Sequence, residues 1–285
     1  MGLVVALLAG IGCAEASSSP ERLTGGSDAP TSATASDGTE SAPAEPAGNP
    51  VASPTKPKDD PGPAPKGCSL QKDGDGFFTR DTGTTKYVGY VPASYDGSPT
   101  RLLVGLHGCG DAAYNFATWA VAPWATRDSQ TYIGISVDGA SGGGNCWDGS
   151  DAKKVLAAID DVASCLYVHK QKVVLAGFSS GGMLAYSVAL QNADRFAGLL
   201  VLNSTLSWAG NADALLGNAA YKLPIAHRAH TQDSVFPINT VRSDWNRIRA
   251  AGFSLQTNEV SGDHDGTSDD WTDWLLPQME SWQAP

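Results

Sequence analysis

The sequence predicts an α/β domain in which helices cover both faces of a mostly parallel β-sheet. Short apolar runs, typical of buried strands, recur from residue 86 onwards, and amphipathic stretches separate several of them. A glycine-rich turn at residues 177–182 joins one such run to a helical stretch. Strands that alternate with crossover helices pair in parallel, and side chains beyond their carboxyl ends then form the site.

The individual elements follow from their hydrophobic spacing. Helical spacing is clearest at Val155, Ile159, Val162 and Leu166, which recur at intervals of four, three and four residues and form one apolar face. The other predicted helices are residues 112–126, 182–194, 239–251 and 271–282. The predicted strands are residues 86–93, 101–108, 132–139, 172–179, 197–204, 223–230 and 253–262.

The chain begins with an expected export signal. Residues 3–11 form an apolar run that is shorter than the ~20 residues of a membrane-spanning helix, so residues 1–12 are predicted to be a signal peptide. The run ends at Gly12 and Cys13, which resemble a bacterial lipobox and predict a lipidated Cys13. The expected location is therefore outside a bacterial cell, as a cell-surface lipoprotein, or as a plain secreted protein if Cys13 is cleaved off with the signal.

Residues 13–66 are predicted to be a disordered tether. Residues 14–66 contain no aromatic residue and ten of the 17 prolines, so they cannot bury enough apolar surface to offset the entropy of ordering. A flexible coil of this length holds a domain roughly 40 Å from its anchor. Residues 67–285 contain every Trp, Tyr and Phe and are predicted to form a single domain.

The charge of the chain limits its partners. The formal net charge is −11, and Lys and Arg residues do not cluster. This balance argues against a nucleic acid or an anionic lipid surface as partner. Membrane contact is expected only through a lipid on Cys13, and the domain is expected to be a monomer.

The cysteines favour disulfides over a metal site. Removing Cys13 leaves an even set, and export makes two disulfides plausible. Sequence alone allows three pairings, but strand polarity favours two particular pairs. Cys109 and Cys146 both follow carboxyl ends of predicted strands, whereas Cys165 lies at the opposite edge, which leaves Cys68 as its partner. No C-x-x-C or H-x-x-x-H spacing occurs, so neither a metal nor a cofactor is expected.

Ser179 is the candidate nucleophile. It lies at the centre of G-F-S-S-G, between a strand-like run and a helical stretch. In such a turn, strained backbone angles hold the serine hydroxyl exposed at the carboxyl edge of the sheet, and the flanking glycines allow close packing. This turn predicts a serine hydrolase of the α/β-hydrolase fold.

A general base must follow the nucleophile, because this architecture has the order serine, acid, histidine. His264 fits best, since it lies in the loop S-G-D-H-D-G-T after a late strand. His227 lies inside a strand pattern and is expected in the core. His230 ends that strand and is expected to shape the loop that carries the acid.

Asp233 is the candidate acid. It follows a strand in the turn H-T-Q-D-S-V-F-P, at the same sheet edge as His264. The alternatives are Asp213, Asp244 and Asp263, each interpreted as a solvated acid. In the predicted triad, His264 takes the proton of Ser179 and returns it to the leaving group, while Asp233 fixes the histidine tautomer.

The oxyanion donors are predicted from the loop L-H-G-C-G at residues 106–110. A glycine-rich loop after an early strand presents bare backbone amides, and the residue after the nucleophile supplies a second one. The backbone N–H groups of Cys109 and Ser180 are therefore the candidate oxyanion hole. His107 is expected to support the loop.

These motifs together resemble one family. G-C-S-L-Q-K-D-G-D-G-F-F-T-R, L-H-G-C-G-D, N-C-W-D-G-S-D, G-F-S-S-G-G-M-L-A-Y, H-T-Q-D-S-V-F-P and G-D-H-D-G look like the secreted polyhydroxybutyrate depolymerases and the feruloyl and acetylxylan esterases of the carbohydrate esterase family 1 type. The resemblance spans nearly all of residues 67–285. It implies ester hydrolysis through an acyl-enzyme, with Ser179, Asp233 and His264 as triad. Asp265 and Gly266 depart from the family pattern, in which an aromatic residue and a proline often follow the histidine.

The expected substrate is an ester-bearing polymer, either a feruloyl or acetyl ester of plant cell walls or a polyhydroxyalkanoate. Only about 20 residues separate the predicted strands that end near Asn203 and begin at Leu223, too few for a large cap domain. Trp147 and Trp208 lie on loops near the open edge and are candidate stacking surfaces for substrate. The alternatives are a serine peptidase of the same fold and a non-catalytic surface binding module.

Overall fold

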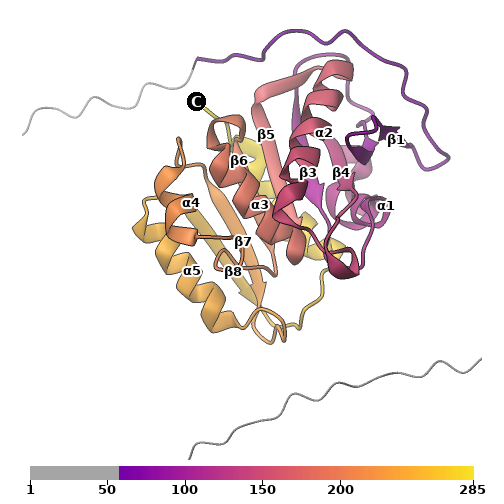
Figure 1. Ribbon diagram of the computed structural model, residues 1–285. Helices are drawn as coiled ribbons and strands as arrows, with labels where there is room; N and C mark the ends of the chain where they lie inside the picture. Colours follow the sequence, from indigo (N-terminus) through magenta and orange to yellow (C-terminus); the bar gives the residue numbers. More distant parts are fainter. Residues whose placement is uncertain (1–57) are drawn as a thin grey trace, which may run out of the picture. The chain divides into compact units, whose positions relative to one another are not determined.

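The computed structural model describes residues 58–285, which contain one eight-stranded sheet with the order β1-β2-β4-β3-β5-β6-β7-β8 (Figure 1). The strands from β3 to β8 pair in parallel, and β1 and β2 form an antiparallel edge beside β4. The strands are β1 (Phe77–Asp81), β2 (Lys86–Tyr90), β3 (Thr100–Leu106), β4 (Ile133–Asp138), β5 (Val168–Phe178), β6 (Gly198–Leu202), β7 (Ile225–His230) and β8 (Leu255–Val260).

The central strands are buried on both faces. Every residue of β6 is buried, as are five of the seven residues of β3, so these strands appear in the sequence as continuous apolar runs. The edge strand β8 contains only half-buried and exposed residues. Seven of the eight strands lie within or overlap the predicted runs. The prediction missed β1, whose sequence F-F-T-R-D is short and charged and pairs only with β2.

Helices cover both faces of the sheet, as predicted. One core cluster joins α2, α3 and α4 to the sheet, and a second joins η1 and the C-terminal helical turns to its other face. The α-helices are α1 (Ala113–Phe116), α2 (Ala152–Cys165), α3 (Ser180–Gln191), α4 (Ala212–Asn218), α5 (Ile238–Ala250) and α6 (Leu276–Gln278). The π-helical turns are η1 (Ala117–Val121) and η6 (Asp270–Leu275), and the 3-10 turns are η2 (Trp124–Ser129), η3 (Gly143–Asn145), η4 (Gly149–Asp151), η5 (Ala193–Arg195) and η7 (Met279–Ser281).

Two predicted helices are divided. The stretch 112–126 consists of α1, η1 and part of η2, and the interruption lies at Pro123, whose ring cannot continue a helix. The stretch 271–282 is divided among η6, α6 and η7. The prediction also missed α4, a short helix in the polar connection between β6 and β7. This connection contains no other helix, so no cap domain covers the sheet edge there.

Two disulfides connect the domain. Cys68 pairs with Cys165 and Cys109 pairs with Cys146. These are the pairs that strand polarity favoured. The first joins the segment before β1 to the end of α2, and the second joins the loop after β3 to the loop after β4. Because the second pair lies beyond the carboxyl ends of two adjacent strands, it fixes loops next to the candidate site.

The contacts of the domain begin before its predicted boundary at residue 67. The Nε2 atom of the buried His169 lies 3.0 Å from Oδ1 of Asp59, and the Asp60 amide donates to the Gln171 side chain. The Tyr167 hydroxyl donates to the Gly62 carbonyl. Residues 59–62 therefore lie against the amino-terminal part of β5, within the stretch that composition assigned to the tether.

The predictions for the signal peptide at residues 1–12, the lipidated Cys13 and the tether up to residue 57 lie outside the described residues. Within residues 58–285, no helix combines the length and the apolar character needed to cross a membrane. The same part of the chain contains no group of three or more His, Cys, Asp or Glu side chains arranged to hold a metal ion.

Candidate active site

Ser179 lies on a strained turn between β5 and α3. Its backbone angles are φ 55° and ψ −123°, a region that L-residues rarely adopt. The turn needs glycine on both sides, because a Cβ on Gly177 would lie 2.4 Å from the Gly181 carbonyl oxygen. A Cβ on Gly181 would lie 2.2 Å from the carbonyl oxygen of Leu106 in β3. The two glycines therefore allow the turn between β5 and α3 to close tightly and to pack against β3.

The structure brings Ser179, His264 and Asp233 together. The Nε2 atom of His264 lies 2.8 Å from Oγ of Ser179, and its Nδ1 atom lies 2.9 Å from Oδ2 of Asp233. A carboxylate only accepts hydrogen bonds, so Nδ1 carries the proton and Nε2 accepts from the serine hydroxyl. Ser179 and Asp233 are 6% and 7% exposed. This arrangement has the geometry of a nucleophile, a base and an orienting acid.

Asp233 is held as a carboxylate by its own turn. Its Oδ1 atom accepts hydrogen bonds of 2.8 Å from the amides of Val235 and Phe236. Burial alone would raise the pKa of Asp233, but the hydrogen bonds from His264 and these two amides lower it below its ordinary value. The acid is therefore ionised and rigidly oriented toward the histidine.

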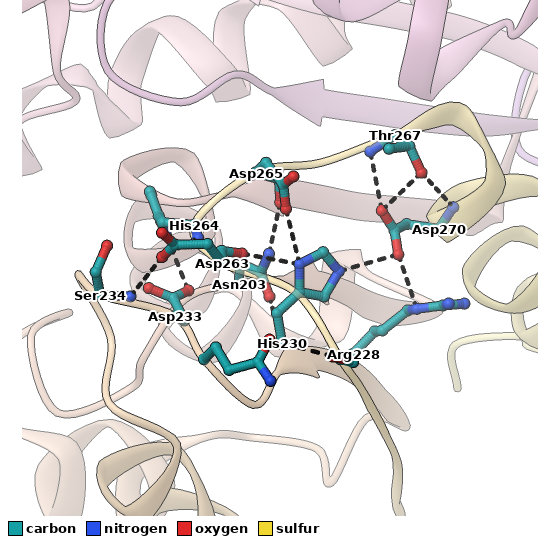
Figure 2. Close-up of polar contacts among 12 residues, drawn as sticks. Asn203, Arg228, His230, Asp233, Ser234, Asp263, His264, Asp265, Thr267 and Asp270 are labelled. Atoms are coloured by element: carbon teal, nitrogen blue, oxygen red, sulfur yellow. Dashed lines mark hydrogen bonds and ion pairs between the residues drawn. The ribbon is translucent and has the colours of Figure 1, made fainter.

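The other candidate acids serve other contacts. Asp263 accepts the amides of Ser234 and His264 and so shapes the loop that carries the base, as Figure 2 shows for Ser234. Asp213 is exposed at the start of α4. The expectation that Asp244 is a solvated acid is wrong, because this residue is 1% exposed. It accepts hydrogen bonds from the hydroxyls of Thr205 and Ser207, and so holds the loop after β6.

The other two late histidines lie inside the domain. His227 is fully buried in β7 with its Nδ1 atom 2.9 Å from the Tyr186 hydroxyl, and burial lowers its pKa to about 3, so it is a neutral core residue as expected. His230, at the end of β7, contacts Asp263, Asp265 and Asp270. The His230 carbonyl also accepts the Asp233 amide at 3.3 Å, so this residue contacts the turn of Asp233, as expected, and the loop of His264 in addition.

The loop after β3 lies directly beside Ser179. A Cβ on Gly108 would lie 2.8 Å from the Phe178 ring and 3.3 Å from Cβ of Ser179. His107 closes this loop on itself, since its Nδ1 atom lies 2.7 Å from the Gly108 carbonyl oxygen. Among residues 58–285, the backbone N–H groups of Cys109 and Ser180 have no protein acceptor. Both amides therefore remain candidates for the oxyanion hole.

The two candidate stacking tryptophans differ in exposure. Trp147 is 8% exposed and donates its indole N–H to the His107 carbonyl at 2.8 Å, so it supports the loop after β3. Trp208 is 60% exposed. Both line a small cavity of about 80 Å³ together with Met183 and Ser187 of α3. Only Trp208 has a large free surface for substrate.

Two phenylalanines contact the candidate base, His264. The Phe178 ring stacks on His264 with a centroid distance of 5.4 Å, and Phe236 meets the same imidazole edge-to-face at 5.3 Å. Phe236 also contacts Trp208 at 5.1 Å. Sequence reasoning missed both residues. Their positions next to Ser179 and in the turn after Asp233 were the available signal.

The sheet and its helices match solved esterases. A ferulic acid esterase of the CE1 class from Anaeromyces mucronatus, solved in complex with ferulic acid, aligns with a TM-score of 0.55 and 12% identity over 70% of this chain and 87% of that chain. S-formylglutathione hydrolase from Staphylococcus aureus aligns with a TM-score of 0.52 and 15% identity over 71% and 96% of the two chains. This domain has the α/β-hydrolase fold.

Sequence comparison of this α/β-hydrolase domain agrees with the resemblance that its motifs indicated. Residues 151–267, less than half of the chain, match the Phospholipase/Carboxylesterase family and include all three residues of the predicted triad. Feruloyl esterase C from Emericella nidulans is 30% identical over 126 residues, which cover 42% of this chain and 47% of that protein. The chain thus matches about half the length of this relative, and in that part it is similar to an esterase of the α/β-hydrolase type.

Proposed function

We propose that this protein is a serine hydrolase of carboxylic esters that acts through an acyl-enzyme. The observation that supports this most strongly is the connected series Asp233, His264 and Ser179, with contacts of 2.9 and 2.8 Å, beside the unengaged amides of Cys109 and Ser180. Acyl transfer needs these groups together: an activated hydroxyl, a base that can return its proton, and donors for the oxyanion.

In the proposed reaction, Ser179 Oγ attacks the ester carbonyl while His264 Nε2 accepts the hydroxyl proton. The carbonyl oxygen becomes an oxyanion that the amides of Cys109 and Ser180 bind, and loss of one such donor typically costs ~3 kcal/mol of transition-state stabilisation. His264 then protonates the departing alcohol oxygen, and the acyl group remains bound to Ser179 as an acyl-serine. A water molecule, deprotonated by His264, attacks this acyl group and regenerates Ser179.

The proposed substrate is an ester borne by a polymer. The short connection between β6 and β7 leaves the edge without a cap domain. Trp208 provides an exposed aromatic surface beside Phe236, and Phe236 in turn contacts His264. The ester is a feruloyl or acetyl ester of a cell-wall polysaccharide, of which the feruloyl ester agrees with the name of the relative feruloyl esterase C. A polyhydroxyalkanoate fits the same open edge.

The proposed location is outside the cell, either free or attached by lipid at Cys13. Two disulfides support an oxidising compartment, because such bonds are rare in the cytosol. The protein is proposed to act as a monomer.

Hydrolysis of p-nitrophenyl acetate by the purified full chain tests the activity. Wild type is expected to hydrolyse this ester, and Ser179→Ala is expected to reduce the rate of hydrolysis to near background. Ser180→Ala is the matched control, because it keeps the backbone amide. Methyl ferulate, acetylated xylan and polyhydroxybutyrate then separate the ester classes. Inactivity on all four, with cleavage of a peptide amide or with glycan binding alone, would replace the proposal by a peptidase or a binding module.

A further inference from the structure

His230 forms the centre of a buried polar network around the loop that carries His264. The residue is 5% exposed, and its ring nitrogens contact three oxygen atoms. Nδ1 lies 2.9 Å from the carbonyl oxygen of Asp263 and 3.0 Å from Oδ1 of Asp265, and Nε2 lies 3.2 Å from Oδ1 of Asp270 (Figure 2).

These partners define the protonation state of the ring. A carbonyl oxygen and two carboxylates only accept hydrogen bonds. A neutral imidazole has one nitrogen without a proton, which can accept a hydrogen bond but cannot donate one to these oxygens. The geometry is satisfied when both nitrogens carry protons. Burial alone would lower the pKa of His230, but its contacts with Asp270, Asp263 and Asp265 raise it above its ordinary value.

The contacts of His230 lie on both sides of the catalytic base. Residues 263 and 265 are the two chain neighbours of His264, and the ring of His230 contacts both. The ring also packs on the backbone of the same loop, because a Cβ on Gly262 would lie 2.6 Å from Nδ1 of His230. His230 therefore constrains the backbone from which the imidazole of His264 extends.

Asn203 and Asp270 connect this arrangement to the rest of the domain. Asn203, directly after β6, accepts the His230 amide at 2.8 Å and donates to the Asp265 carbonyl at 2.6 Å. Asp270 accepts the amide and hydroxyl of Thr267 at 2.9 and 3.0 Å, and it forms an ion pair of 2.9 Å with Arg228. The charged side chains of the network are thus Arg228 and protonated His230 against Asp265 and Asp270.

We propose that His230, in its doubly protonated form, is a positioning residue that fixes the loop bearing His264 in the reactive geometry. The inference rests on the proposed function for its kinetic consequence. Deprotonation would turn one ring nitrogen into an acceptor that faces oxygen atoms, so the loop would loosen at high pH and His264 would lose its alignment with Ser179. A displacement of about 1 Å can reduce a rate ~100-fold.

The first test compares kcat and KM for p-nitrophenyl acetate in wild type and His230→Gln, each normalised to the fraction of sites that react with a fluorophosphonate. We expect kcat to fall ~10- to 100-fold while KM changes less than about twofold. His169→Gln is the matched control. His169 lies at the start of β5, is also buried, and contacts a carboxylate, that of Asp59. A normalised kcat within about twofold of wild type would overturn the proposal.

The second test is the pH profile of kcat. In wild type the rate is expected to decline as the pH rises through the raised pKa of His230, because the protonated ring that fixes the loop is then lost. This alkaline decline should be absent from His230→Gln. Asp265→Asn, at a side chain that is 68% exposed, removes one of the facing carboxylates and should move the decline to lower pH, because one of the contacts that raise the pKa of His230 is then lost. An unchanged alkaline limb in both variants contradicts the proposal.

A third measurement does not depend on turnover. The downfield proton resonance of the His264–Asp233 hydrogen bond in the full chain should be broadened or lost in His230→Gln and retained in His169→Gln. A resonance that stays sharp and unshifted in His230→Gln overturns the positioning role. If wild type hydrolyses no ester, the proposed function fails, and this spectrum still decides whether His230 fixes the loop.

Discussion

The Nε2 atom of His264 lies 2.8 Å from the Oγ atom of Ser179, although 85 residues separate the two in the chain. The contact depends on two loops at one edge of the parallel sheet, one after β5 and the other after β8. The sheet therefore brings the proposed nucleophile and the proposed base to the same edge, and the loops only need to orient the side chains.

Asp233→Asn tests the acid. The amide keeps the shape of the carboxylate but cannot stabilise an imidazolium, and it favours the wrong tautomer of His264. We expect kcat to fall by roughly 10³- to 10⁴-fold at neutral pH. Asp213→Asn, at an exposed acid on α4, is the control and should leave kcat unchanged. A loss below about tenfold would assign the orienting role to another group.

Cys146→Ser tests whether the Cys109–Cys146 disulfide holds the loop after β3. Removing this bond frees the backbone of Cys109, so we expect a lower kcat for p-nitrophenyl acetate at a temperature where the protein stays folded. Cys165→Ser removes the other disulfide and should lower the free energy of unfolding by about 2–5 kcal/mol while kcat of the folded protein is retained. Equal effects of both variants on kcat would count against a specific role of Cys109.

Trp208→Ala tests the exposed aromatic surface. This side chain lies beside Phe236 and outside the hydrogen-bonded triad, so we expect KM for acetylated xylan or methyl ferulate to rise severalfold while kcat for p-nitrophenyl acetate stays the same. Trp124→Ala is the matched control, because Trp124 is 61% exposed and lies over Arg127 on η2. Equal effects of both substitutions on the larger substrates would show that Trp208 has no particular role.

The carboxyl group of Asp151 is expected to make the free energy of unfolding depend on pH. It accepts hydrogen bonds from the amides of Ser141 and Asp148 and from the Ser141 hydroxyl, and it pairs with Lys154 at 2.8 Å. Burial alone would raise the pKa of Asp151, but these donors lower it to about 2. A lowered pKa stabilises the folded state above the unfolded pKa of about 3.9, and this contribution is lost as the pH falls toward 2.

Urea unfolding at several pH values checks this contribution. Asp151→Asn is expected to lower the free energy of unfolding by about 1–3 kcal/mol at pH 7. The difference from wild type should shrink as the pH falls from about 4 to about 2, because the wild-type carboxylate then takes up a proton as well. A difference that stays constant over this range would mean that the charge of Asp151 contributes nothing.

The sequence was most informative where backbone pattern and strand polarity decide the structure. Apolar runs located seven strands, and the order of nucleophile, acid and base along the chain singled out Ser179, Asp233 and His264, which the structure brings together. The same polarity argument separated Cys109 and Cys146 from Cys165. Each of these inferences needs only the direction of a strand and the edge at which it ends.

The sequence was least informative where loops contact each other through side chains. Asp244 lies in a helix with a polar sequence, so its pattern predicts exposure. Its carboxylate is buried because the loop after β6 folds over it and donates hydrogen bonds from Thr205 and Ser207. The contacts of His230 with Asp265 and Asp270 likewise depend on how the loop after β8 folds back over β7. Short elements such as β1 and α4 have too few periodic residues to stand out from their polar surroundings.

Covalent labelling at Ser179 tests the central claim most directly. A fluorophosphonate should add one phosphonyl group per protein, and mass spectrometry of peptides should locate it on Ser179 in wild type. In His264→Ala the labelling rate should fall by at least about 10³-fold, because the hydroxyl then has no base. Modification of a different residue, or an undiminished labelling rate in His264→Ala, would contradict the assignment.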